Sequence, residues 1–481
     1  MKQPDQRIVA EIVDAVLARL DLETKGAARS LPQSRPASPP AAGCLFDDVD
    51  RAVDATERAQ RVWAGTSRET KGRVIAALRK AMHENAEEFA RLALEETGMG
   101  RYEDKLLKHH QAADATPGLE DLETRSWAGD KGLVYEDYGP YGVIAAITPS
   151  THPVPVLFNS MVIMIAPGNG VVFNAHPAGK RVSAKAVTIF ERVIRENGGP
   201  ANLITMIREP TLEGAEKLFA HRTVRIIAAT GGPGLVRAAF AAGKKVIAAG
   251  PGNPPVLVDE TASLRSASRH IIDGASFENN IICFAEKEAF VVGAVYEDFM
   301  RAMAEEGAVR LSKQQVERLA DQAFQKDERG RVIVNREFIG KNASVLARAV
   351  GLSIPDDVRL LYGEATFDCP FVQEEQMMPY LPVVRVRDAD EGIELSAKAE
   401  HGYGHTAAIH SHNLDVITKF NRVLDAAVIV VNGPSLAGDG GYGGEGTFSH
   451  TIASPTGEGI CTPRHFARVR RVAMYRHLQM R

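Results

Sequence analysis

Apolar and polar residues along this chain follow the spacing of amphipathic helices and short buried strands. From residue 46 to about 122 the apolar positions keep a helical period, with a helix stop at 97–100. Residues 126–138 predict a β-hairpin that turns at the glycines of 129–132. Beyond residue 139, apolar runs alternate with helical stretches such as 159–166 and 265–275. This alternation predicts an α/β protein with mostly parallel sheets.

The apolar runs define the strands that we expect. They are 142–147, 170–174, 203–207, 224–230, 255–258, 289–295, 332–334, 382–386, 406–410 and 427–431. The strand that ends at Thr230 is followed by Gly231 and Gly232, a turn that could place backbone N–H groups against a pyrophosphate. The turn is not a regular GxGxxG motif, and glycines also close such turns without a ligand. The glycine-rich stretch 433–446 predicts a loop, either for close approach of a ligand or as a flexible surface segment.

The first 45 residues have a different pattern. Apolar residues form one stripe of a helix over about 5–22, and charges interrupt it too often for a secretory signal. A linker over 23–45 follows, with four prolines and few large side chains. We expect residues 1–22 to dock into a groove of another protein. The alternatives are a helix that folds back onto the body, or a dimer contact.

Composition narrows the class of protein. At 481 residues the chain should form two or three domains, and 44% hydrophobic with 25% charged residues is typical of a globular protein. The net charge of −4 gives no reason to expect nucleic-acid binding. No apolar run reaches about 18 residues, so no membrane helix is expected. Four scattered cysteines without a CxxC pair disfavour disulfides or a structural zinc site, and we expect no metal.

One of these cysteines, Cys283, stands between a predicted helix and a strand. A rigid scaffold can hold a nucleophile toward a cleft at such a connection. The alternative is a buried structural thiol, because a free cysteine most often only packs. The pattern around Cys283 alone does not decide between the two.

Several motifs taken together carry a family resemblance. They are 139–144, 148–153, 230–232, 279–283, 285–288, 432–435, 443–447 and 455–459. In this order and spacing, residues 46–481 resemble the aldehyde dehydrogenase superfamily, and most of all its CoA-acylating branch from bacterial microcompartments. The helix and linker at the start resemble the encapsulation peptides that carry enzymes into such shells.

The resemblance implies an aldehyde dehydrogenase-like fold in three parts. A Rossmann-like domain for NAD and CoA would comprise 46–125 and 139–250. An α/β catalytic domain would comprise 251–461. A small β element from 126–138 and 462–481 would form the contacts of a homodimer or homotetramer.

The same resemblance implies roles for the chemistry. Cys283 as a thiolate would attack an aldehyde, and hydride transfer to NAD would leave a thioester. His152 stands where family members commonly have an oxyanion-binding Asn, and a neutral imidazole can also donate one hydrogen bond. Alternatively, His152 only caps the following turn.

Further residues are expected to bind the nucleotide: Thr148, Pro149, Ser150, Asn174, His176, Pro177, Thr230, Gly231, Gly232, Gly250 and Glu375. Glu375 matches the glutamate that binds the nicotinamide ribose. Asn174 and Pro177 stand where NAD-preferring members often carry Lys and Glu. The acidic residue that would exclude a 2′-phosphate is therefore absent from this sequence.

The fate of the thioester depends on a residue that is missing. Hydrolytic members carry a general-base Glu where this sequence has Ala249, and alanine cannot activate water. We therefore expect transfer to CoA, with Glu278 as the nearest carboxylate that could substitute for the base. The resulting hypothesis is oxidation of a short-chain aldehyde, with propionaldehyde favoured, to its acyl-CoA.

The expected location and partners follow from the same resemblance. The enzyme would work in the bacterial cytoplasm, inside the lumen of a microcompartment, with a shell protein bound through residues 1–22. One alternative is a hydrolytic NAD(P)-dependent enzyme that releases the free acid. The other is a shell scaffold whose site has decayed.

Overall fold

The computed structural model describes residues 43–328 and 330–480, and the predicted helix over 1–22 lies outside them. A short strand, β1 (Leu45–Phe46), leads into the helices α2 (Val49–Ala64), α3 (Arg68–Thr97) and α4 (Tyr102–Ala115). Ser67 caps α3 by accepting the Thr70 N–H at 3.2 Å, and Gly98 ends it with a φ of 65°. The helical pattern from residue 46 onward is confirmed.

Six strands form the first large sheet, in the order β1-β6-β5-β4-β7-β8. Their bounds are β4 (Val143–Thr148), β5 (Gly170–Ala175), β6 (Ile204–Ile207), β7 (Val224–Thr230) and β8 (Lys245–Ala249). All the pairs are parallel. From β4 the chain builds outward to β5 and β6, and then restarts on the other side with β7 and β8. A crevice for a ligand is expected where this order switches, beyond the carboxyl ends of β4 and β7.

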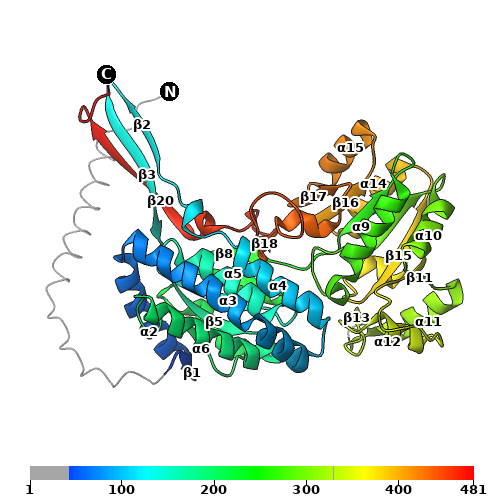
Figure 1. The fold of residues 1–481 in the computed structure, drawn as a ribbon, viewed down its shortest axis with the longest axis horizontal. Coiled ribbons are helices and arrows are strands. Elements are labelled where there is room, and N and C mark those ends of the chain that lie inside the picture. The colour runs from blue at the N-terminus through cyan, green and yellow to red at the C-terminus, as the bar shows by residue number, and fades with distance from the viewer. Residues whose placement is uncertain (1–42, 329, 481) are drawn as a thin grey trace, which may run out of the picture. The chain divides into compact units, whose positions relative to one another are not determined.

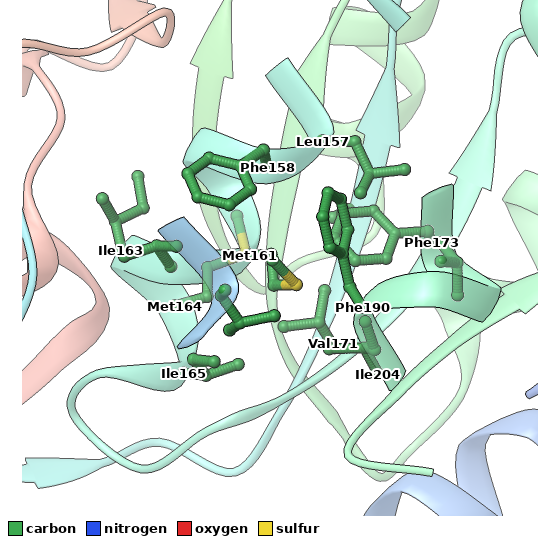
Figure 2. Packing of buried hydrophobic residues seen from close by; sticks show 14 of the residues in the cluster. Leu157, Phe158, Met161, Ile163, Met164, Ile165, Val171, Phe173, Phe190 and Ile204 are labelled. Atoms are coloured by element: carbon green, nitrogen blue, oxygen red, sulfur yellow. The ribbon is translucent and has the colours of Figure 1, made fainter. Parts of the chain in front are cut away.

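Helices α5 (Pro153–Ile165), α6 (Lys180–Glu196), α7 (Leu212–Ala220) and α8 (Pro233–Ala241) connect these strands. Every residue of α5 is buried, because α3, α4, α6 and β5 all pack around it. Figure 2 shows its side chains Phe158 and Met161 beside Phe190 of α6; the Phe158 and Phe190 rings meet edge to face at 5.5 Å. This core holds the carboxyl ends of β4 and β5 in a rigid setting.

Seven parallel strands form the second sheet, in the order β11-β14-β15-β10-β9-β16-β17. Their bounds are β9 (Pro255–Val258), β10 (Glu288–Val292), β11 (Val309–Arg310), β14 (Leu361–Glu364), β15 (Tyr380–Val386), β16 (Thr406–His410) and β17 (Val428–Val431). The accompanying helices are α9 (Leu264–Ser276), α10 (Tyr296–Glu305), α11 (Lys313–Ala323), α12 (Ala343–Ala349), α13 (Pro370–Gln373), α14 (Ala389–Ala399) and α15 (Leu414–Leu424). The mixed α/β class with parallel sheets is confirmed.

Three short pieces differ from the prediction. The 332–334 run is strand β13 (Val332–Val334), but it pairs antiparallel with β12 (Phe324–Lys326) outside the large sheets. Helix α5 starts at Pro153, earlier than expected, because a proline suits the first turn of a helix. The 433–446 stretch is not a surface loop throughout, since it contains a short 3-10 helix, η4 (Ser435–Asp439), with Leu436 and Asp439 buried.

A third sheet is small and antiparallel. Strands β2 (Arg125–Gly129) and β3 (Gly132–Pro140) form the predicted hairpin, and β20 (Ala467–Tyr475) pairs with β3 along its length. Figure 1 shows these three strands, cyan and red, lying side by side. Trp127 is 51% exposed and Val469 is 61% exposed. This three-stranded sheet, called the arm below, therefore presents apolar side chains to the outside.

Candidate active site

One cavity of about 490 Å³ brings together Cys283, His152 and every residue that the sequence singled out for nucleotide binding. They are His152, Cys283, Thr148, Pro149, Ser150, Asn174, His176, Pro177, Thr230, Gly231, Gly232, Gly250 and Glu375. They come from the carboxyl ends of β4, β5, β7 and β8 and from loops of the second sheet. A larger cavity of about 660 Å³ beside α11 and β12 contains none of these residues. The 490 Å³ cavity, called the active-site cavity below, is therefore the candidate site.

A strained turn carries Cys283 into this cavity. Glu278, Asn279 and Asn280 have φ values of 52°, 53° and 65°, and all three are fully buried. Left-handed backbone costs energy at residues other than glycine and persists only where the surroundings enforce it. Here the Asn280 side-chain amide donates to the Ala275 and Glu286 carbonyls at 2.7 and 2.8 Å. The turn is thus fixed from both sides of Cys283.

A buried lysine also fixes the nucleophile. The Lys287 ammonium donates to the carbonyl oxygens of Asn280 at 2.7 Å and Ile282 at 3.0 Å. These two carbonyls lie just before Cys283 in the chain. Lys287 is fully buried, so the hydrogen bonds act in a setting from which water is excluded. Its charge also opposes the effect of burial, which raises the pKa of the Cys283 thiol.

The Cys283 thiol is nevertheless held in its neutral form. Burial, and then the charge of Glu375, raise the pKa of Cys283 to about 12. Burial likewise raises the pKa of Glu375 to about 7. The thiolate, not the thiol, is the nucleophile, so the free site keeps its nucleophile largely protonated at neutral pH.

The backbone at Gly252 lies close to the backbone of Cys283. A Cβ placed on Gly252 would lie 2.3 Å from the Cys283 carbonyl oxygen and 3.1 Å from Cγ of His405. Only glycine fits this position. The connection from β8 to β9 therefore packs against the Cys283 loop through bare backbone.

His152 precedes α5 but makes no side-chain cap hydrogen bond with the described residues of that helix, so the turn-cap alternative is wrong. Burial, followed by the nearby Lys108 charge, holds the pKa of His152 well below its usual range. A neutral imidazole still has one N–H to donate. His152 is thus able to donate to an oxygen in the active-site cavity.

Glu278 does not lie where a substitute base would have to lie. Its carboxylate is fully buried and accepts from the Arg101 backbone N–H at 2.9 Å and the Lys105 ammonium at 3.0 Å, with Lys108 as a further ion pair. These cations lower the pKa of Glu278 against the effect of burial. Among the described residues that line the active-site cavity, Glu375 is the only carboxylate. The expectation that Glu278 could replace the missing base is therefore wrong.

The nucleotide-side residues lie around the switch in strand order. Thr148 ends β4, Thr230 ends β7, and α8 begins at Pro233 directly after the two glycines. Within the described chain, no side chain caps the start of α8. Pro233 has no N–H, and the Leu235 and Val236 N–H groups donate to the Gly232 carbonyl at 3.0 and 3.3 Å, which leaves the Gly234 N–H for an anion. Asn174, at 4% exposure, has a side-chain oxygen without a hydrogen-bond partner among the described residues.

Sequence reasoning missed four residues around Cys283. No motif spacing could have shown that Lys287 and Gly252 contact the Cys283 loop, or that His405 lies beside Gly252. His450 also lines the cavity, and its ring lies edge to face with His152 at 6.0 Å between centroids. For these four residues, the only indication in the sequence was that Lys287 lies inside the 285–288 motif. Over residues 43–328 and 330–480, no cluster of three His, Cys, Asp or Glu side chains could hold a metal ion.

Comparison with known proteins agrees with this geometry. The profile of the aldehyde dehydrogenase family matches residues 41–323, and the chain belongs to this family. The chain is 41% identical to the acetaldehyde dehydrogenase (acetylating) EutE of Salmonella typhimurium, over 98% of each chain. No helix in the described part of the chain is long and apolar enough to cross a membrane.

Solved structures add two close relatives. A propionaldehyde dehydrogenase from the Clostridium phytofermentans fucose utilisation bacterial microcompartment matches with a TM-score of 0.88 at 42% identity, over 91% of this chain and all of that one. A Rhodopseudomonas palustris propionaldehyde dehydrogenase with bound CoA and an acylated cysteine matches with a TM-score of 0.88 at 38% identity, over 92% of this chain and 100% of the other.

Proposed function

We propose that this protein is a CoA-acylating aldehyde dehydrogenase that oxidises a short-chain aldehyde such as propionaldehyde. The observation that carries this proposal is the composition of the active-site cavity. It contains a cysteine and a neutral histidine, and Ala249 stands where a water-activating base would be. The named activities of the relatives support the same reaction.

The side chains divide the first half of the reaction between them. The Cys283 thiolate adds to the aldehyde carbonyl, and the new oxyanion accepts hydrogen bonds from the His152 imidazole and the Cys283 backbone N–H. Lys287 stabilises the thiolate through its charge and holds the loop that carries it. Loss of hydride from the thiohemiacetal carbon leaves a thioester on Cys283.

The cavity residues also suit a dinucleotide. The turn of Thr230, Gly231 and Gly232 would hold the pyrophosphate at the start of α8, and Glu375 would hold the nicotinamide ribose. A bound NAD supplies the hydride acceptor. Asn174 and Pro177 stand where NAD-preferring members of the family often carry Lys and Glu, so no carboxylate at these positions would exclude a 2′-phosphate, and NADP should also be accepted.

The thioester then passes to a thiol. Ala249 cannot deprotonate water, and the Glu278 carboxylate is held by its lysines. Attack of the CoA thiolate on the thioester carbonyl releases the acyl-CoA and returns the Cys283 thiolate. The hydrolytic alternative lacks a base at the position where this family places one, and a decayed site would not keep the complete set of cavity residues.

The direct test measures NADH formation from propionaldehyde and NAD, with and without CoA. Sustained turnover only in the presence of CoA is expected. Ala249→Glu should add turnover without CoA, whereas the matched Ala249→Gln should not, since an amide cannot act as a base. Equal wild-type turnover with and without CoA would overturn the acylating assignment.

The cellular setting is proposed from the first 45 residues. Residues 1–22 would bind a shell protein and place the enzyme in the lumen of a bacterial microcompartment in the cytoplasm. Deletion of 1–22 should leave the kinetics unchanged and abolish co-localisation with a shell. Unchanged co-localisation would contradict this role.

A further inference from the structure

Two histidines of the active-site cavity have ring nitrogens that the proposed chemistry leaves without a partner. Among the described residues, Nδ1 of His152 and both ring nitrogens of His450 lack a hydrogen bond. Both side chains line the cavity that holds Cys283, and each residue is only 6% exposed. A buried polar group without a hydrogen-bond partner lowers the stability of the fold by about 1–3 kcal/mol, and such groups are rare in native proteins. A bound molecule that hydrogen-bonds these nitrogens would remove this cost.

The charge state of the two histidines limits what that molecule can be. Burial and the nearby Lys108 lower the pKa of His450 to about 3, and the pKa of His152 is also lowered. Each ring therefore offers one donor and one acceptor at neutral pH. The Lys108 ammonium is itself paired with Glu278. None of the described residues that line the cavity is Lys or Arg, so a carboxylate would find no cation.

The other side chains around the active-site cavity limit the polarity of the molecule. Ile281, Phe284 and Ile452 line the same cavity and present apolar side chains. Phe448 packs against the His450 ring edge to face, at 4.8 Å between centroids. His450 is thus a hydrogen-bonding group set among apolar walls. A hydroxyl both donates and accepts, which matches a neutral histidine in such a setting.

We infer that the preferred substrate is a short aldehyde bearing a hydroxyl group, and that His450 determines this specificity by hydrogen-bonding the hydroxyl. The inference rests on the proposed aldehyde-oxidising function and narrows its substrate class. A site built to hydrogen-bond a substrate hydroxyl discriminates against the analogue that lacks it. The apolar analogue remains a substrate, because Cys283 and His152 act on the carbonyl common to both.

The test compares glycolaldehyde with propionaldehyde, in which a methyl group replaces the hydroxyl. With NAD and CoA, and at matched concentrations of free aldehyde, kcat/KM for glycolaldehyde should exceed that for propionaldehyde by about tenfold, the effect of one hydrogen bond. His450→Phe keeps an aromatic ring and removes both nitrogens. This variant should lower the ratio by about tenfold or more, because kcat/KM for glycolaldehyde falls further than that for propionaldehyde.

Two further variants keep the test decisive. His450→Asn retains a donor and an acceptor and should keep the preference within about threefold, even if His450→Phe folds poorly. His410→Phe is the matched control, because His410 is also buried with an unpartnered Nε2 among the described residues but does not line the cavity. Its ratio should equal that of the wild type.

Three results would overturn the inference. One is a wild-type preference for propionaldehyde that His450→Phe leaves unchanged, as expected if the nitrogens only bind water. The second is a preference for succinate semialdehyde over both neutral aldehydes, which would indicate an anion site. The third is a preference that His450→Asn abolishes as fully as His450→Phe does. The proposed function fails separately, by NADH formation that does not require CoA.

Discussion

At the scale of single residues, the neutral state of the Cys283 thiol is the feature that most affects reactivity. Burial and Glu375 oppose the thiolate, and Lys287 favours it. Of the two charged groups, Glu375 changes its own charge near neutral pH, because its pKa is about 7. The reactivity of Cys283 should therefore depend on pH in a way that Glu375 controls.

Glu375→Gln should speed alkylation of Cys283 by iodoacetamide in the free enzyme. The substitution removes a negative charge that raises the thiol pKa, so the gain should be small at pH 6 and reach about threefold to tenfold at pH 9, the effect of up to one pKa unit. Peptide mass spectrometry can follow Cys283 separately from the other three cysteines. Glu374→Gln is the control, and an equal rate in both variants would contradict this account.

At the scale of elements, two segments that meet at the Cys283 loop determine where the nucleophile lies. The connection after β8 passes the Cys283 carbonyl with no room for a side chain. The left-handed turn of Glu278, Asn279 and Asn280 is held by partners from distant parts of the chain, including Arg101 and Lys105. We make a separate prediction for each of these two segments.

Gly252→Ala should lower kcat about a hundredfold, since its Cβ would displace the Cys283 loop and a shift of about 1 Å can cost that much. Gly129→Ala is the matched control, because a Cβ there meets no described atom within 4 Å. Steady-state kinetics with saturating aldehyde and CoA would measure the effect. A Gly252→Ala enzyme with wild-type kcat would show that the loop does not depend on this contact.

Glu278→Gln should destabilise the protein by about 3–5 kcal/mol, because it leaves buried Lys105 and Lys108 without their anion. In the wild type the folded-state pKa of Glu278 is below its usual 4.5. Its contribution is therefore complete above pH 4.5 and is lost as the pH falls through the folded-state value. Urea unfolding at pH 7 would measure the difference, with the exposed-pair variant Glu57→Gln as a control expected to stay within about 0.5 kcal/mol. A Glu278→Gln protein as stable as that control would contradict the prediction.

The sequence allowed the larger elements and the glycine turn after β7 to be predicted, because apolar periodicity and glycines indicate them locally. It did not show β14, where Gly363 interrupts the apolar run. A Cβ at Gly363 would meet Val316 Cγ2 at 2.7 Å, so a tertiary contact selects the glycine. Gly252 was missed for the same reason. The contacts of Lys287 and the confinement of Glu278 by lysines of α4 also depend on the folded chain, and no spacing in the sequence records them.

At the scale of the whole molecule, the arm is the sheet that exposes large apolar side chains on two of its strands. Val469 and Tyr475 are 61% and 68% exposed on β20, and Trp127 on β2 is 51% exposed. Several large exposed apolar side chains on one small sheet favour a protein interaction site. We propose that the arm joins copies of this chain into a homodimer or homotetramer.

Replacing Trp127 and Val469 with Glu should convert the oligomer to monomers, as measured by light scattering after gel filtration. Charges on an apolar contact surface are costly to bury, whereas the arm itself is already exposed and should still fold. Ile333→Glu, at another apolar side chain that is 44% exposed, is the control and should not change the mass. If the double variant has the same mass in solution as the wild type, the arm is not part of the interface.

The pairing of β20 with β3 has a consequence for the order of events during synthesis. Arg468 donates to the Pro140 carbonyl across 328 positions of sequence. At about 5–20 residues per second, β3 leaves the ribosome on the order of tens of seconds before its partner strand exists. The hairpin must wait with an unpaired edge until β20 has been synthesised. A chain that stops before β20 therefore cannot complete the arm, and only polypeptides in which β20 has been synthesised carry a finished one.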